Sequence, residues 1–124
     1  MTVRSLEAQV RHQPRVAIID LHGEINAFAE DVLNSAYTDA ESRKSDVILL
    51  NFSDVDYINS TGIALIVSLL ARARKSKRRL LACGLSNHYV EIFQITRLVD
   101  FMNVFPDEKS ALADSPASII TSHE

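Results

Sequence analysis

The apolar residues of the chain follow two spacings, one typical of strands and one typical of helices. Short apolar runs bounded by polar residues predict buried strands, at residues 16–21, 47–52 and 80–83. Apolar residues at three- and four-residue steps predict a helix over residues 27–40, with Asn26 as its N-cap. A second helix starts at Ser60 or Thr61 and ends near Lys75. Strands and helices therefore alternate along the chain.

Weaker signals extend this pattern toward both ends of the chain. Residues 3–10 alternate weakly and predict a first strand, which a turn at residues 11–14 joins to the strand that Gly23 ends. Near the other end, three further elements are predicted: a helix that Ser86 caps and that runs to about Ile95, an edge strand at residues 102–105, and a last helix at residues 108–113 after Pro106 and Asp107.

The order of the predicted elements indicates an α/β fold. Strands that alternate with helices form a largely parallel sheet, and the first hairpin adds an antiparallel strand at its edge. We therefore expect a single mixed sheet of four or five strands, with an N-terminal β-hairpin and about four helices. A length of 124 residues fits one domain, at residues 1–113, followed by a flexible tail at residues 114–124.

Composition and charge narrow the class of protein. The chain is 47% hydrophobic and 23% charged, which is typical of soluble globular proteins. A net charge of −3 argues against nucleic-acid binding. The N-terminus has no apolar signal segment, and the longest apolar stretch, residues 63–71, is too short for a bilayer, so we expect a cytoplasmic protein without membrane contact. The single cysteine, Cys83, is expected to be buried.

The junction between the strand at residues 47–52 and the following helix is the strongest candidate for a functional site. A polar loop is predicted at residues 53–59, and such junctions lie at the carboxyl edge of a sheet, where sites usually form. Ser60 stands at the helix N-terminus, where free N–H groups favour an anion, and Gly62 leaves room for close approach. A purely structural role, with Ser60 or Thr61 as the helix N-cap, explains the same residues.

Other chemistry finds little support in the sequence. No P-loop or G-x-G-x-x-G motif occurs, the four histidines are scattered without a base for a catalytic serine, and no metal-ligand spacing is present. We expect no cofactor and no metal, and nothing demands more than a monomer or weak dimer. The basic run at residues 72–79 suits nucleic acid or anionic lipid, or a solvated helix end whose cations compensate the dipole.

Three motifs resemble the STAS domain family, and most closely its bacterial anti-sigma-factor antagonists. Residues 23–26 resemble the Gly-Glu-apolar-Asp that follows the second strand of that family, and residues 92–98 resemble its apolar-Phe-x-x-Thr-Gly-Leu. The third motif follows the strand at residues 47–52 and resembles the family's signature, which ends in Asp-Ser-Ser/Thr-Gly: it is Asp54-Val55-Asp56-Tyr57-Ile58-Asn59-Ser60-Thr61-Gly62. The resemblance spans about residues 3–113.

The resemblance implies a non-enzymatic regulator in a partner-switching pathway. In this family, an anti-sigma factor that is also a serine kinase of the histidine-kinase-like ATPase type binds the unphosphorylated antagonist and releases its sigma factor. The kinase phosphorylates the serine that corresponds to Ser60, and a PP2C-type phosphatase reverses the reaction. The docking surface implied for this chain consists of Asn26, Asp54, Asp56, Asn59, Thr61 and Gly62.

Three residues depart from the family pattern. Asn59 stands where an aspartate usually precedes the serine, and Asn26 stands where an aspartate usually follows Gly-Glu-apolar. Both changes remove negative charge near the implied docking surface, so we expect an altered choice of partner or weak phosphorylation. Arg97 replaces the glycine after threonine, which predicts a different helix C-cap.

Three other functions are considered at this level, and two of them are disfavoured. A ligand-sensing or scaffold STAS module would bind an anion, lipid or nucleotide at the Ser60 helix N-terminus without modification. A domain detached from an anion transporter is disfavoured, because no membrane segment is present. An enzyme such as a nucleotide hydrolase is disfavoured by the missing P-loop and the missing base.

Overall fold

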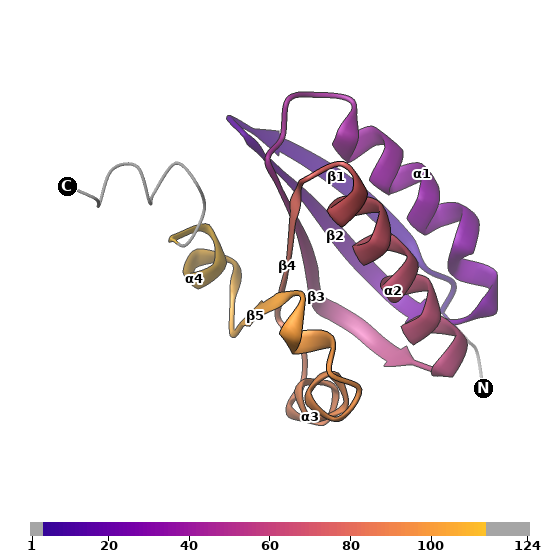
Figure 1. Cartoon of the computed structure of the whole chain (residues 1–124). Coiled ribbons are helices and arrows are strands. Elements are labelled where there is room, and N and C mark those ends of the chain that lie inside the picture. Colours follow the sequence, from indigo (N-terminus) through magenta and orange to yellow (C-terminus); the bar gives the residue numbers. More distant parts are fainter. Residues whose placement is uncertain (1–3, 114–124) are drawn as a thin grey trace.

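The computed structural model describes residues 4–113, which form five strands and four α-helices in the predicted order (Figure 1). The strands are β1 (Glu7–Gln13), β2 (Val16–Ile25), β3 (Val47–Ile58), β4 (Arg79–Cys83) and β5 (Asn103–Phe105). The α-helices are α1 (Glu30–Glu41), α2 (Ser60–Lys75), α3 (Asn87–Ile95) and α4 (Glu108–Ala113), and two short 3-10 helices are η1 (Ala27–Ala29) and η2 (Leu98–Asp100). The tail predicted at residues 114–124 lies outside the described residues.

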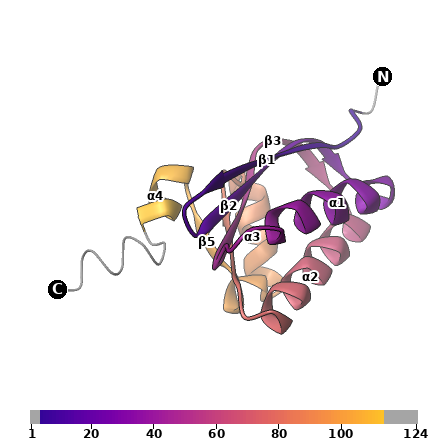
Figure 2. The ribbon, with the colours of Figure 1, turned by 90° about the horizontal axis from the view of Figure 1, so that it is seen from above.

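The five strands form one mixed sheet in the order β1-β2-β3-β4-β5. β1 pairs antiparallel with β2, and the other three pairs are parallel, which confirms the predicted sheet. α1 connects β2 to β3 and α2 connects β3 to β4, and the two helices lie side by side on one face (Figures 1 and 2). The carboxyl ends of β2 and β3 therefore meet at one edge, from which η1 and α2 begin.

Successive residues of the central strands enter two cores on opposite faces of the sheet. One core holds alternate residues such as Ala17, Ile19 and Ile48, together with the inner sides of α1, α2 and α3. The other core lies under α4 and consists of Val16, Ile18, Val47, Leu49, Leu81, Cys83 and Ala111. Burial raises the pKa of the Cys83 thiol to about 11, so this thiol is protonated at neutral pH, and its predicted burial is confirmed.

The first hairpin differs from its prediction. β1 begins at Glu7 rather than at residue 3, and the turn lies at Pro14 and Arg15 rather than at residues 11–14. Arg15 has a φ of 68°, and a proline followed by a left-handed residue is typical of a type II turn. The alternation of β1 is weak because this edge strand half-buries only three side chains, Ala8, Val10 and His12, so its ends were not visible in the sequence.

β2 and β3 are both longer than predicted. β2 passes through Gly23 and ends at Ile25, and the predicted loop at residues 53–59 is the second half of β3, which ends at Ile58. Two register shifts give β3 two more residues than β2 over the same length of pairing. These β-bulges break the regular alternation, so the segment has the polar appearance of a loop. Gly23, with φ of 109°, leaves room for the N-terminal segment, because a Cβ there would lie 2.6 Å from the Ser5 carbonyl oxygen.

The end of α3 keeps the left-handed residue that usually follows a helix C-cap, so the different C-cap predicted from Arg97 is not found. Thr96 is the C-cap of α3, and Arg97 has a φ of 66°, in the left-handed region that glycine usually occupies. The Arg97 side chain compensates in part by bonding Asp100 at 2.7 Å. The chain thus keeps the turn of the family motif without its glycine.

Candidate functional site

The candidate site is built around the cap of α2. Asn59 Oδ1 accepts a hydrogen bond from the Gly62 N–H at 2.8 Å, and the Asn59 carbonyl accepts one from the Ile63 N–H at 2.9 Å. The Asn59 N–H donates to the Ile25 carbonyl at 3.2 Å, which ties the cap to the end of β2. Asn59 is therefore the N-cap, and the alternative in which Ser60 or Thr61 is the cap is wrong.

Because Asn59 is the cap, the hydroxyls of Ser60 and Thr61 are not used for capping. Both residues are exposed in the first turn of α2, and neither hydroxyl has a hydrogen-bond partner within residues 4–113. Their backbone N–H groups belong to the first turn, where a helix has no internal acceptors. The helix macrodipole places partial positive charge at the same point, so negative charge added to Ser60 is stabilised there.

Asn26 performs the same task on the neighbouring strand. Its Oδ1 accepts from the Phe28 N–H at 2.9 Å, and its carbonyl accepts from the Ala29 N–H at 3.0 Å. Asn26 therefore caps the short 3-10 helix η1 and not, as predicted, the α-helix that follows, which begins at Glu30. Asn26 and Asn59 directly follow Ile25 and Ile58, which are paired in the sheet, so the two caps stand side by side. An amide oxygen caps a helix as well as a carboxylate does. Both departures from the family pattern therefore keep the local structure and remove only the charge.

Gly62 is required by the close approach of α2 to β2. A Cβ at this position would overlap the Ile25 carbonyl oxygen and lie 2.8 Å from its carbonyl carbon. Gly62 is buried, so it shapes the site by allowing this approach rather than by presenting a surface of its own. Beneath the site, the Tyr89 hydroxyl of α3 accepts a hydrogen bond from the Ile58 N–H at 2.9 Å. This support comes from 31 residues further along the chain, and no local pattern indicated it.

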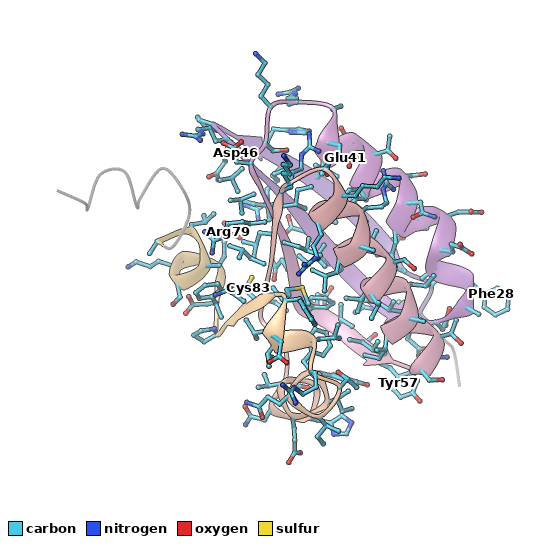
Figure 3. The ribbon with its side chains drawn as sticks, in the orientation of Figure 1. Phe28, Glu41, Asp46, Tyr57, Arg79 and Cys83 are labelled. Carbon is cyan, nitrogen blue, oxygen red and sulfur yellow. The ribbon has the colours of Figure 1, made fainter. Side chains whose placement is uncertain are left out.

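Two aromatic side chains project from the same end of the molecule. Phe28 in η1 is 92% exposed and Tyr57 near the end of β3 is 51% exposed. Figure 3 shows both at the end where α2 begins, away from Glu41 and Asp46 at the opposite end. Phe28 was not among the predicted site residues, although a phenylalanine off the apolar stripe of the first predicted helix is a usable signal. Exposed aromatic side chains are typical anchors of protein interfaces.

The structure separates the two predicted aspartates from the cap. Arg4 donates from Nε to Asp56 Oδ2 at 2.9 Å and from Nη2 to Asp54 Oδ1 at 3.2 Å, so one guanidinium bridges both carboxylates. His22 Nδ1 lies 2.8 Å from Asp54 Oδ2. The hydrogen bond from Arg4, followed by that with His22, lowers the pKa of Asp54. These carboxylates hold the N-terminal segment against β3, and Arg4 was not anticipated because it is 50 residues away in sequence.

The arrangement presents a hydroxyl for modification or docking. Within residues 4–113, no histidine or carboxylate bonds the Ser60 hydroxyl, since His22 contacts Asp54 and His12 contacts Asp39. The same residues contain no group of three or more His, Cys, Asp or Glu side chains placed to hold a metal ion. Ser60 is thus an accessible hydroxyl at a positive helix end, with aromatic side chains nearby.

Most of the chain matches the model of one known protein family. A family model described as the STAS domain matches residues 7–111. The chain belongs to the STAS domain family. This STAS domain is 26% identical over 100 residues to an anti-sigma-B factor antagonist of Staphylococcus aureus, an alignment that covers 81% of this chain and 93% of that protein.

Solved structures agree with the STAS fold. An anti-sigma factor antagonist from Mycobacterium paratuberculosis has a TM-score of 0.77 at 16% identity, over 90% of this chain and 94% of that one. The Bacillus cell fate determinant SpoIIAA in its phosphorylated form has a TM-score of 0.65 at 20% identity, over 85% of this chain and 96% of that one. At these identities the likeness concerns the fold. No helix within residues 4–113 of this STAS domain is long and apolar enough to cross a membrane.

Proposed function

We propose that this STAS domain is an anti-sigma-factor antagonist that acts in the cytoplasm through partner switching. In this proposal its unphosphorylated Ser60 end binds an anti-sigma factor that is also a serine kinase, and a PP2C-type phosphatase restores that state. The observation that carries the proposal is the free, exposed Ser60 hydroxyl at the start of α2, beside exposed Phe28 and Tyr57. The relatives that are themselves named anti-sigma factor antagonists support it.

Phosphorylation of Ser60 has a clear physical consequence at this position. A phosphate adds about 1.5 to 2 negative charges and three strong acceptors. The free N–H groups of Ser60 and Thr61 stabilise it on the helix, so the fold is retained. A partner that covers Phe28 and Tyr57 must exclude water from that charge, and the desolvation disfavours the complex. The modification therefore switches binding off without unfolding the domain.

The proposed docking surface is revised by the geometry. Asn26, Asn59, Thr61, Phe28 and Tyr57 stand at the end where α2 begins and form its centre. Gly62 acts from below by allowing α2 to approach β2. Asp54 and Asp56 belong to its margin, where Arg4 already neutralises much of their charge. A partner adapted to this surface meets less negative charge than the family pattern implies.

The proposal predicts a single phosphorylated residue. Incubating the chain with its cognate serine kinase and ATP is expected to add one phosphate at Ser60, located by mass spectrometry of peptides. Ser60→Ala abolishes the labelling, and Thr61→Ala, its matched neighbour in the same turn, retains it. Labelling that persists in Ser60→Ala, or no labelling by any kinase of this type from the same genome, contradicts the proposal. In the latter case, calorimetric binding of small anions or nucleotides supports the ligand-sensing function instead.

The cap itself provides a second test. Asn59→Ala removes the acceptor of the Gly62 N–H and is expected to destabilise the domain by about 1 kcal/mol in urea unfolding. Asn59→Asp keeps an acceptor, so its stability stays within about 0.5 kcal/mol of the original, while it restores the charge of the family pattern beside Ser60. As a control, Asn34→Ala changes an exposed asparagine inside α1 and is expected to be neutral or slightly stabilising. Equal loss in Asn59→Asp and Asn59→Ala contradicts the capping role.

A further inference from the structure

Most of the 13 lysines and arginines of the chain lie at the end of the domain opposite to Ser60. The β1–β2 turn, the α1–β3 loop and the α2–β4 loop meet there, because β2, β3 and β4 begin in register at that end. Glu41 and Asp46 mark this end in Figure 3. We call it the basic end, and its cations are Arg15, Arg43, Lys44, Arg72, Arg74, Lys75, Lys77, Arg78 and Arg79.

Backbone hydrogen bonds join these three segments into one surface. The Asp46 N–H donates to the Arg15 carbonyl at 2.8 Å, and the Arg79 N–H donates to the Asp46 carbonyl at 2.9 Å. Arg78 Nε donates to the Ser45 carbonyl at 2.9 Å. Folding therefore adds the cations of two distant segments to the basic run at residues 72–79. The sequence showed that run alone, and a compensated helix end accounts for only its first three cations.

Apart from Arg79 and from Arg74, which lies over the Phe101 ring, the cations of the basic end form an inner and an outer set. The inner arginines are held by the domain itself: Arg15 pairs with Asp46, and Arg72 and Arg78 both pair with Glu41. The outer set consists of exposed residues whose side chains have no ion pair or hydrogen bond within residues 4–113: Arg43, Lys44, Lys75 and Lys77. The side chains of the outer set are thus charged, exposed to solvent and unpaired within the described residues.

Positive and negative charges lie at opposite ends of the domain, which the net charge of −3 does not reveal. The opposite end carries Glu24, Glu30 and Asp31, together with the two aspartates that Arg4 bridges. β3 has 12 residues, so it spans about 40 Å at roughly 3.3 Å per residue. Screening reduces charge interactions beyond about 8 Å at physiological salt. A surface that touches the basic end therefore meets its local positive charge and not the average of the chain.

The chemistry around the outer set favours one kind of partner. The exposed large hydrophobic side chains of residues 4–113 lie outside the turns and loops of the basic end, and only Phe101 lies at its margin, under Arg74. A protein interface needs a desolvated apolar centre, and single-stranded nucleic acid needs aromatic side chains for stacking. An anionic lipid surface needs neither, since four to eight clustered lysines and arginines suffice.

We propose that the basic end docks on the anionic phospholipid surface of a membrane. Contact through the outer set directs the Ser60 end away from the bilayer, since the two ends are separated by the length of β3. The interaction is electrostatic and reversible, because the described loops of the basic end expose no large hydrophobic side chain for insertion. Membrane docking does not depend on phosphorylation at Ser60. It can therefore be tested separately from the proposed antagonist function.

Vesicle sedimentation tests the proposal on the full chain. We expect binding to phosphatidylcholine vesicles that contain about one-third phosphatidylglycerol in about 0.05 M salt, and its loss in about 0.5 M salt. The triple variant Lys44→Gln, Lys75→Gln and Lys77→Gln removes three outer cations. Each cation contributes about fivefold in affinity, so the variant is expected to bind roughly a hundredfold more weakly.

A variant with the same change in net charge serves as the control. Gln9→Glu, Asn34→Asp and Gln94→Glu are exposed and lie outside the basic end, and we expect this triple variant to keep most of its binding. Equal loss in both triple variants overturns the proposal, since net charge and not the basic end would then decide binding. It is also overturned by equal binding to pure phosphatidylcholine vesicles, by no binding at low salt, or by tighter binding of a single-stranded DNA oligonucleotide than of the anionic vesicles.

Discussion

Gly62→Ala is expected to destabilise the domain by about 2 to 4 kcal/mol, more than any other single change at the site. In an exposed helix the same substitution stabilises by about 1 kcal/mol, because alanine is the better helix former. Here the new methyl group overlaps the Ile25 carbonyl, a backbone group that the hydrogen bond from the Asn59 N–H holds close to the start of α2. The free-energy cost of the steric overlap therefore exceeds the free energy gained from the higher helix propensity of alanine.

Urea unfolding measures this difference, and the same helix offers a matched control. Ser68 lies on the exposed side of α2, and its hydroxyl donates a hydrogen bond only to the Ala64 carbonyl of the same helix. Ser68→Ala is therefore the control. We expect that variant to change stability by less than about 0.5 kcal/mol. A Gly62→Ala protein as stable as the original would mean that α2 does not approach β2 as closely as described, and the placement of Ser60 would lose its support.

Ser60→Glu is expected to weaken binding of the cognate anti-sigma factor about a hundredfold or more. A charged group left unpaired in an interface costs about 2 to 5 kcal/mol, which corresponds to a thirtyfold to several-thousandfold loss of affinity. Ser60 begins α2 at the end of the molecule that also carries exposed Phe28 and Tyr57, so a partner that covers this end encloses the new carboxylate. Isothermal titration calorimetry with the purified partner measures the loss.

Two substitutions separate the effect of charge from that of size and place. Ser60→Ala removes the hydroxyl without adding charge and is expected to keep affinity within about threefold, because the hydroxyl makes no bond within residues 4–113. Ser68→Glu adds the same carboxylate two turns further along α2, and we expect a similarly small effect. If Ser68→Glu weakens binding as much as Ser60→Glu does, the partner does not dock on the Ser60 end.

The order of the elements could be predicted because each helix carries its own local signals. Ser86 accepts a hydrogen bond from the Tyr89 N–H, and Asp107 accepts one from the Ser110 N–H, so the cap residues visible in the sequence do begin α3 and α4. The ends of β2 and β3 could not be predicted in the same way. Their second halves pair through bulges and expose polar side chains, so neither a continuous apolar run nor a regular alternation marks them.

At the site, the positions of the residues could be predicted from the sequence, but the structural role of each residue could be seen only in the fold. The position of Ser60 at a helix start followed from local pattern and family resemblance. The need for glycine at residue 62 did not, because it arises from the contact of α2 with the Ile25 carbonyl of β2. That Asn59 is the cap depends on the geometry of one turn, in which its side chain reaches the Gly62 N–H. The contacts of Arg4 with Asp56 and of Tyr89 with Ile58 join segments far apart in sequence, and no periodicity encodes such pairs.

The two bulges of β3 also restrict how this segment can vary in length during evolution. Between Asp20 and Ile25 of β2, the partner strand advances from Asn51 to Ile58 and gains two residues. Phe52, Val55 and Ile58 nevertheless pack on the same core at three-residue steps, so each bulge takes up one extra residue without turning the later side chains to the opposite face. Loss of a bulge together with its extra residue would shorten β3 and keep this facing. Relatives are therefore expected to differ in length at the bulges, where Ser60 and its cap stay beside Ile25, rather than in the regularly paired stretch before them.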